Sequence, residues 1–333
     1  MNLPPPLLFL HLLADRKLKP DAVMLGFGDG DSDSDSMQAL VAHPDFSALV
    51  TELPCLVSAA DASRLPADLL QSLQDAGCQL LTDDPVHRSD EQYRPALPVA
   101  ARWLSGDWYL APPAKPVGNQ AASRALALKL VQLVAADADT REIEDVFRRD
   151  PVLAYHLLRL VNSLGMGMEK RISSFSQAIL ILGRQQLKRW LNLLLFSASK
   201  DDHRSAMLLA RVAVRARSME LLAKATGLDR AKQDQAFMGG MFSLLGILFG
   251  LPLVEVIEPL HLGDVLSGAL LRHEGETGGL LQAIKAAESA DSASLNVLLD
   301  GLQIAATGFN QINLEAHRWM LDVIRDKQDA TDG

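Results

Sequence analysis

The stretch DPVLAYHLLRLVNSLGMG, residues 150–167, decides the fold class of the larger part of this chain. Asp150 followed by Pro151 is typical of a helix start, because proline has no N–H to leave unpaired in the first turn. Gly165 suits the left-handed end of a helix. Apolar residues recur between them at i, i+4, i+7, i+8 and i+11, namely Leu153, Leu157, Leu160, Val161 and Leu164. This single apolar stripe predicts a buried helix.

Three polar residues of this predicted helix could be chemical or structural. His156 lies beside the apolar stripe, and Asn162 and Ser163 fall in the last turn, where short polar side chains commonly satisfy free backbone groups. We interpret all three as structural polar positions. Catalysis or metal binding by His156 is the alternative, and it requires further ligands close by. The eight histidines are scattered along the chain and none is directly followed by aspartate, so no catalytic residue, metal ligand or cofactor is predicted.

The composition indicates a globular and mainly helical protein. Its 333 residues are enough for two cores, and 48% are hydrophobic while only 5% are aromatic. A net charge of -9 argues against nucleic acid as a partner, because phosphate binding needs a concentrated basic surface. Cys55 and Cys78 form neither a disulfide framework nor a zinc pattern, which fits a cytoplasmic location.

No membrane segment is expected. The apolar run Leu7–Leu13 is too short to span a bilayer, and we interpret it as a strand. The uncharged stretch Ala236–Val254 is longer, but four glycines and Pro252 interrupt it. A buried helix is the better interpretation of that stretch.

The chain divides near LAPPAKPVGNQ, residues 110–120, a proline-rich stretch typical of an interdomain connector. Before it, short apolar runs alternate with one clear helical stretch at residues 65–77, which predicts strands and helices in alternation. After it, the pattern is helical to the end, with predicted helices that include 231–249 and 294–308. The acidic stretch DGDSDSDS, residues 29–36, lacks the glycine and glutamate of a calcium loop and predicts a linker.

Two long segments carry a family resemblance. RRDPVLAYHLLRLVNSLGMGMEKRISSFSQAILILGRQQLKRWLNLLL (148–195) and AFMGGMFSLLGILFGLPLVEVI (236–257) resemble HDOD domains that follow an EAL-type domain. The HDOD resemblance covers about residues 120 to 325. HDOD domains are helical and related to HD phosphohydrolases, without their metal ligands. RLPADLLQSLQDAGCQLLTDD (64–84) and GDWYLAPP (106–113) are similar to the paired-aspartate segment and the last strand of EAL domains, which are cyclic di-GMP phosphodiesterases built as α/β barrels.

The departures from the EAL pattern are large. No Glu-Ala-Leu triplet occurs, and Asp83 and Asp84 alone cannot hold two metal ions. The resemblance therefore implies an α+β chain. A truncated, degenerate EAL-like α/β domain at residues 1–113 precedes an all-α HDOD domain at residues 114–333. It also implies a protein that is not an enzyme.

A basic surface is the candidate interaction site. The cationic and polar residues on the outer faces of two predicted helices are Arg184, Gln185, Lys188, Arg189, Arg211 and Arg215. Guanidinium groups match carboxylates and phosphates, so this surface could receive an acidic partner or a nucleotide. A solvated face, or pairing with the acidic N-terminal domain, is the alternative.

The functional expectation is a bacterial signal transduction regulator that binds other signalling proteins through its HDOD domain. Two alternatives remain open. One is a receptor for cyclic di-GMP or another nucleotide without turnover, and the other is a residual metal-dependent phosphohydrolase.

Overall fold

A computed structural model describes residues 6–28, 34–82, 85–90, 96–111, 129–130, 132–133, 136–149, 189, 202–260 and 262–328. The N-terminal third forms one six-stranded sheet, whose order is β4-β3-β2-β1-β6-β5. The strands are β1 (Leu8–Ala14), β2 (Pro20–Phe27), β3 (Cys55–Val57), β4 (Gln79–Leu80), β5 (Val86–Arg88) and β6 (Trp103–Ser105).

The central strand β1 is antiparallel to both of its neighbours, β2 and β6. A tight turn joins β1 to β2, in which the Asp15 carboxylate accepts the backbone N–H groups of Lys17 and Lys19 at 2.8 and 2.9 Å. The other neighbouring strands, β2 with β3, β3 with β4 and β5 with β6, are parallel. The sheet is therefore mixed and open at both edges, and it curls into a half-barrel.

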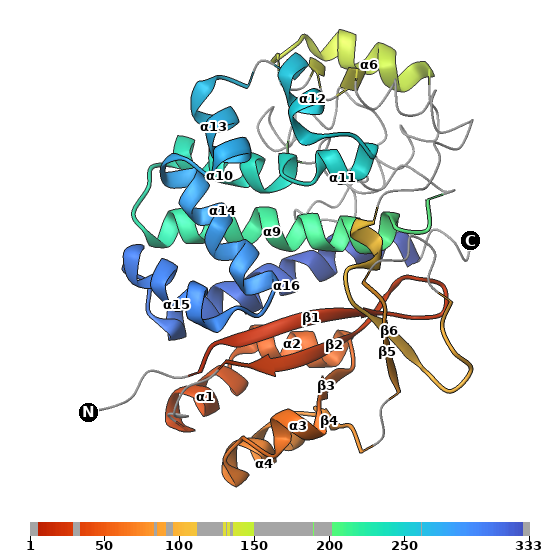
Figure 1. Ribbon diagram of the computed structural model, residues 1–333, viewed down its shortest axis with the longest axis vertical. Helices are drawn as coiled ribbons and strands as arrows, with labels where there is room; N and C mark the ends of the chain where they lie inside the picture. The colour runs from red at the N-terminus through yellow and green to blue at the C-terminus, as the bar shows by residue number, and fades with distance from the viewer. Residues whose placement is uncertain are drawn as a thin grey trace, which may run out of the picture.

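Helices make up the rest of the described chain. Those near the sheet are α1 (Ser34–Val41), α2 (Pro44–Glu52), α3 (Ala59–Ala62), α4 (Ala67–Asp75) and the 3-10 turn η1 (Trp108–Leu110). Those that follow are α6 (Thr140–Arg149), α9 (Ser205–Ala225), α10 (Arg230–Phe242), α11 (Leu245–Phe249), α12 (Leu253–Ile257), η2 (Glu258–Leu260), α13 (Asp264–Arg272), α14 (Gly275–Glu288), α15 (Ser292–Gly301) and α16 (Ala306–Gln328). In Figure 1 the long helices α9 and α16 lie between the sheet and helices α10 to α13.

The contact between sheet and helices depends on two asparagines of α16. Asn310 accepts a hydrogen bond from the Leu8 backbone N–H at 2.8 Å and donates one to the Pro6 carbonyl at 3.0 Å. Asn313 donates to the Leu8 carbonyl at 2.9 Å. Strand β1 pairs with β6 only through Ala14 and Leu104. At the other end of β1, the Asn310 and Asn313 side chains take the hydrogen-bonding positions that a neighbouring strand would fill. Most buried apolar residues from Leu7 to Val323 accordingly form one large core, and a smaller second cluster in the sheet consists of Leu13, Ala22, Leu56 and Trp103.

The expected fold class is wrong for the N-terminal region. A truncated α/β barrel predicts strands joined by helical crossovers, whereas the β1–β2 hairpin and the antiparallel β1–β6 pair make a mixed open sheet. Apolar alternation in the sequence marks a strand without fixing the direction of its neighbour. The helical character of the C-terminal region is confirmed, because no strand follows Ser105 in the parts of the chain that the structure describes. The boundary near residue 113 stays a prediction, since residues 112–128 lie outside those parts.

Some predicted elements differ in their bounds. The segment GDWYLAPP was expected as a strand, but its described part, residues 106–111, contains the turn η1, and the strand β6 precedes it. The predicted helix 231–249 is two helices, α10 and α11, which separate at Ser243 and Leu244. The predicted helix 294–308 ends at Gly301, because Gln303 takes a left-handed backbone conformation with φ of 57°.

Gly240 lets α10 pack closely against α9. A Cβ atom at this position would lie 2.6 Å from the Ala216 Cα atom and 2.9 Å from its nitrogen. We predict that Gly240→Ala lowers the free energy of unfolding by about 1–3 kcal/mol, because two helix backbones must separate. Gly279→Ala in α14 is the matched control, since nothing lies within 4 Å of its added carbon. Urea unfolding of both variants measures the difference, and equal stability would contradict this packing.

Candidate functional site

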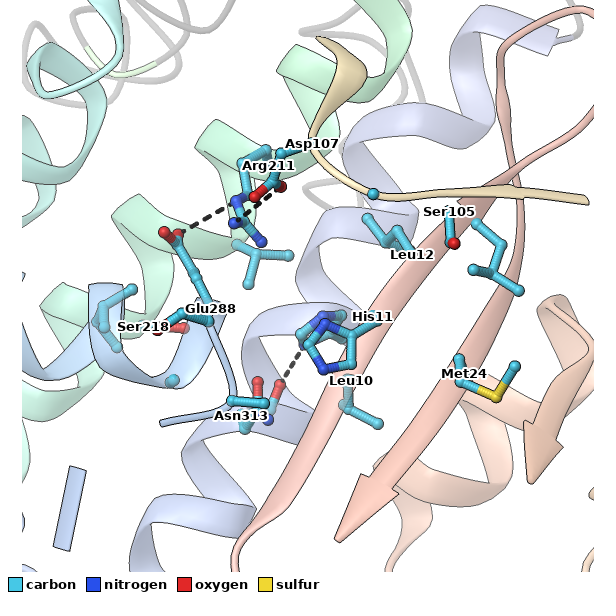
Figure 2. A pocket seen from close by; sticks show the side chains of 18 of the residues that line it. Leu10, His11, Leu12, Met24, Ser105, Asp107, Arg211, Ser218, Glu288 and Asn313 are labelled. Atoms are coloured by element: carbon cyan, nitrogen blue, oxygen red, sulfur yellow. Dashed lines mark hydrogen bonds and ion pairs between the residues drawn. The ribbon is translucent and has the colours of Figure 1, made fainter. Parts of the chain in front are cut away.

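A cavity of about 390 Å³ lies where the sheet meets the helical region. Strand β1 and the segment after β6 form one side, and helices α9, α14 and α16 form the other. Its apolar lining includes Leu12, Ile284 and Phe309. Figure 2 shows polar side chains that converge on it from both sides, among them His11 of β1, Arg211 of α9 and Glu288 of α14. A volume in this range accommodates a small organic molecule.

Two histidines form the part of the cavity near α16. His317 is only 3% exposed, and its Nδ1 lies 2.8 Å from the Asn313 carbonyl oxygen. Burial lowers the pKa of His317 to about 4, and the charges of His11 and Arg211 act in the same direction. Burial, followed by the charge of Arg211, also lowers the pKa of His11. Both imidazoles are therefore neutral near pH 7 and present one donor and one acceptor each.

The burial of His317 predicts a loss of stability in acid. Its pKa of about 4 is below the unfolded value of 6.5, so the unfolded chain binds the proton more readily. The stability that depends on this group is complete above pH 6.5 and is lost as the pH falls towards 4, to an extent of about 3 kcal/mol. Denaturant unfolding at pH 7.5, 5.5 and 4.5 should show a shallower decline for His317→Gln than for the wild type. The same decline in both proteins would exclude His317 as its source.

Arginine and glutamate side chains form the opposite part of the cavity. Glu288 accepts two hydrogen bonds from Arg215 in a bidentate arrangement, from Nε to Oε1 at 2.8 Å and from Nη2 to Oε2 at 2.6 Å. Arg211 lies further away, with Nε 3.4 Å from a Glu288 oxygen and Nη2 3.7 Å from Asp107. Burial alone would raise the pKa of Glu288, but Arg211 and Arg215 hold it below its ordinary value. Glu288 is consequently ionised at neutral pH.

The predicted interaction residues that the structure describes are buried or paired, whereas the sequence predicted an exposed surface. Arg189 is buried and pairs with Glu220 and Asp234, and its guanidinium lies over the Phe237 ring. Arg211 and Arg215 line or border the cavity and pair with carboxylates. These three arginines do not form an exposed surface, and Arg211 pairs with the N-terminal region, which was the alternative. The remaining predicted positions, Arg184, Gln185, Lys188, His156, Asn162, Ser163, Asp83 and Asp84, lie outside the described residues.

Most of the residues that line the cavity carry no signal in the sequence. His11 sits in the apolar run of β1, and Glu288 and His317 belong to helices with no motif around them. A histidine inside an apolar strand was the one available signal. Its partners come from residues about 100, 200 and 300 positions further along, and no local pattern relates such distant positions.

Known proteins place the helical region in a family. Residues 123–256 match the HDOD domain, so the chain contains an HDOD domain, as its sequence resemblance predicted. The protein YuxH of Bacillus subtilis is 30% identical over 192 residues, which cover 57% of this chain and 46% of YuxH. The cyclic di-GMP phosphodiesterase CdgJ of Vibrio cholerae is 32% identical over 203 residues, which cover 60% of this chain and 46% of CdgJ.

The matched part thus spans about half the length of each of these relatives. A crystal structure of a protein from Shewanella amazonensis SB2B, provisionally described as a phosphohydrolase, aligns with 61% of this chain and 93% of its own. Its sequence identity is 16% and its TM-score is 0.43. The EAL-like identity of the N-terminal region stays without support from these proteins.

The prediction that the chain is not an enzyme is wrong. It depended on the absence of two known ligand patterns, whereas a relative with 32% identity is named a phosphodiesterase. A missing motif excludes one arrangement of ligands and leaves others, because catalytic groups can come from any part of a fold. Within the ranges that the structure describes, no group of three or more His, Cys, Asp or Glu side chains could hold a metal ion.

None of the helices in the described ranges is long and apolar enough to cross a membrane. Residues Ala236–Phe242 instead belong to α10, and Leu245–Phe249 form the short helix α11.

Proposed function

We propose that this chain is a cytoplasmic signal transduction regulator whose HDOD domain binds another signalling protein, in the setting of cyclic di-GMP signalling. The observation that carries the proposal is the HDOD domain at residues 123–256, in a chain 32% identical to a relative named a cyclic di-GMP phosphodiesterase. Because that relative is matched over only 46% of its length, its activity and partners do not transfer directly.

The described contacts support a regulatory role, because they connect the helices to the sheet and to the segment that follows it. The buried Arg204, at the start of α9, donates to the Ala111 carbonyl beyond η1 and to the Ile247 carbonyl of α11. Asn310 and Asn313 hold β1 from the other side. A partner that shifts the helices would therefore also act on the sheet and on the cavity between them.

The partner surface can be tested at the three predicted positions of this segment that lie outside the described residues. A variant with Arg184→Ala, Gln185→Ala and Lys188→Ala leaves the buried Arg189 in place. Affinity purification of the full chain from the bacterium, followed by quantitative mass spectrometry, should show a specific signalling protein that the triple variant recovers at least tenfold less. Arg318→Ala is the control, since Arg318 forms an i,i+4 pair with Asp322 on α16. The same recovery with wild type and triple variant would contradict this surface.

Hydrolysis of cyclic di-GMP is the second candidate function, and the name of the Vibrio cholerae relative favours it. Incubation of the full chain with cyclic di-GMP and either Mn²⁺ or Mg²⁺ tests it, with chromatography of the linear dinucleotide as the readout. Turnover would establish a hydrolase. Calorimetric binding without turnover would establish a nucleotide receptor. The absence of both binding and turnover would exclude cyclic di-GMP as a direct ligand.

A further inference from the structure

Two buried guanidinium groups in the cavity region share one buried carboxylate. Arg215 is 7% exposed and Glu288 is 10% exposed. Arg215 contacts both Glu288 oxygens and donates to the Ser243 hydroxyl at 2.8 Å. Its charge is therefore paired, and each of its three nitrogens donates a hydrogen bond within the chain.

Arg211 is held much more loosely. Its side chain is 16% exposed, and its Nε is buried without a hydrogen-bond partner among the described residues. Its contacts with Glu288 and Asp107, at 3.4 and 3.7 Å, are longer than charged hydrogen bonds usually are. Asp107 is 56% exposed, so water screens most of its attraction. Arg211 is thus a mostly buried cation that makes no short hydrogen bond to a carboxylate among the described residues.

The surroundings of Arg211 suit an anion that has an apolar part. Glu288, Tyr109 and Asp107 raise the pKa of Arg211 against the effect of burial, which keeps it charged. Arg88 lies at the cavity too, but its side chain is 76% exposed and pairs with Asp90. The two neutral histidines and the apolar residues Leu12, Ile284 and Phe309 form much of the remaining lining. The cavity therefore offers a forked, permanent positive charge, flanked by the Glu288 and Asp107 carboxylates, beside an uncharged space (Figure 2).

We propose that this cavity binds a small organic anion. Its phosphate or carboxylate group would accept hydrogen bonds from the Arg211 guanidinium, and its apolar part would lie against Leu12, Ile284 and Phe309. The proposal goes beyond the partner-binding function and does not depend on it, because it concerns a separate ligand at the junction of sheet and helices.

Phenylphosphonate is the first probe, because its carbon–phosphorus bond resists phosphoester hydrolysis and it combines a dianionic group with an apolar ring. We expect it to raise the melting temperature of the full chain by roughly 2–4 °C at saturating concentration. Benzoate tests a carboxylate in the same position. Benzamide, which lacks the charge, should bind at least tenfold more weakly than benzoate. Inorganic phosphate at equal affinity would show adventitious anion binding only and would overturn the proposal.

Arg211→Gln distinguishes a ligand-binding arginine from a structural one. It removes one of the two charges that keep Glu288 ionised, but Glu288 keeps both of its hydrogen bonds from Arg215, so the melting temperature of the ligand-free variant should fall by less than that of Arg215→Gln. Its affinity for phenylphosphonate should fall at least tenfold, and Arg211→Lys, which keeps the charge without the fork, should show an intermediate loss.

Arg215→Gln is the matched control, because it removes the arginine that Glu288 already satisfies. This variant should melt at a lower temperature than the wild type. The proposal fails if Arg211→Gln is destabilised like the control, or if its affinity for phenylphosphonate and benzoate equals that of the wild type. It also fails if neither anion binds the wild type.

Discussion

Replacement of Arg204 by alanine should lower the free energy of unfolding by about 3–5 kcal/mol, because it leaves a buried carboxylate without its partner. Arg204 is 1% exposed and Asp202 is 8% exposed. Arg204 donates to Asp202 from Nε at 3.0 and 3.1 Å and from Nη2 at 2.7 Å. It also donates to the carbonyls of Ala111 and Ile247, at 3.1 and 3.3 Å. One side chain therefore joins segments that are 93 and 43 residues away.

The matched control for Arg204 is Arg318→Ala. Arg318 pairs with Asp322 on the same helix, and both side chains are about a third exposed. Such a surface pair contributes little, so this variant should lose less than about 0.5 kcal/mol. Guanidinium chloride unfolding of the two variants gives the comparison. A similar small loss in both would mean that Arg204 does not connect these segments in solution.

Replacement of Glu220 by alanine should also cost about 3–5 kcal/mol. Glu220, in α9, is 3% exposed and contacts Arg189 and Arg217, each at 2.7 Å. Arg189 is only 10% exposed, so its loss of Glu220 leaves a buried cation with Asp234 as its remaining carboxylate partner in the described chain. Chemical unfolding at pH 7 measures the loss. A loss below about 1 kcal/mol would contradict the burial of this ion pair, because solvent-exposed pairs contribute no more than that.

The pH dependence of this second effect has a definite sign. Burial alone would raise the pKa of Glu220, but the hydrogen bonds and charges of Arg189 and Arg217 lower it below its ordinary value of 4.5. The folded protein therefore holds this proton less tightly than the unfolded chain. The stabilisation is complete above the ordinary pKa and is lost as the pH falls below 4.5. The wild type and Glu220→Ala should consequently approach one another in stability in acid, and a constant difference would contradict this.

Local sequence patterns predicted part of the fold well. The run Leu7–Leu13 was expected as a strand and forms β1, and the helical stretch at residues 65–77 contains α4. Pairing direction could not be read in this way, because alternation fixes which side chains face the core and leaves the neighbouring strand open. The antiparallel hairpin instead depends on the turn at Asp15. The hydrogen bonds that stabilise this turn, from the backbone N–H groups of Lys17 and Lys19 to the Asp15 carboxylate, are visible only in the folded structure.

The candidate site was predictable to a smaller extent. The sequence singled out Arg211 and Arg215 as cations one turn apart, but as an outer surface. Their burial follows from α14, which brings Glu288 to within hydrogen-bond distance of Arg215 from 73 residues away. A charge on a helix is solvated by default unless a partner reaches it. Helical periodicity carries no information on such a partner, so the paired cluster had to be found in the structure.

Hydrogen exchange measured by mass spectrometry, with and without phenylphosphonate, tests most directly whether the junction of the sheet with helices α9, α14 and α16 is a ligand site. We expect slower exchange in wild-type peptides that contain β1, the first half of α9 and the end of α14, and no such change in Arg211→Gln. Unchanged exchange in these three segments at a saturating concentration, or equal protection in the variant, would contradict it.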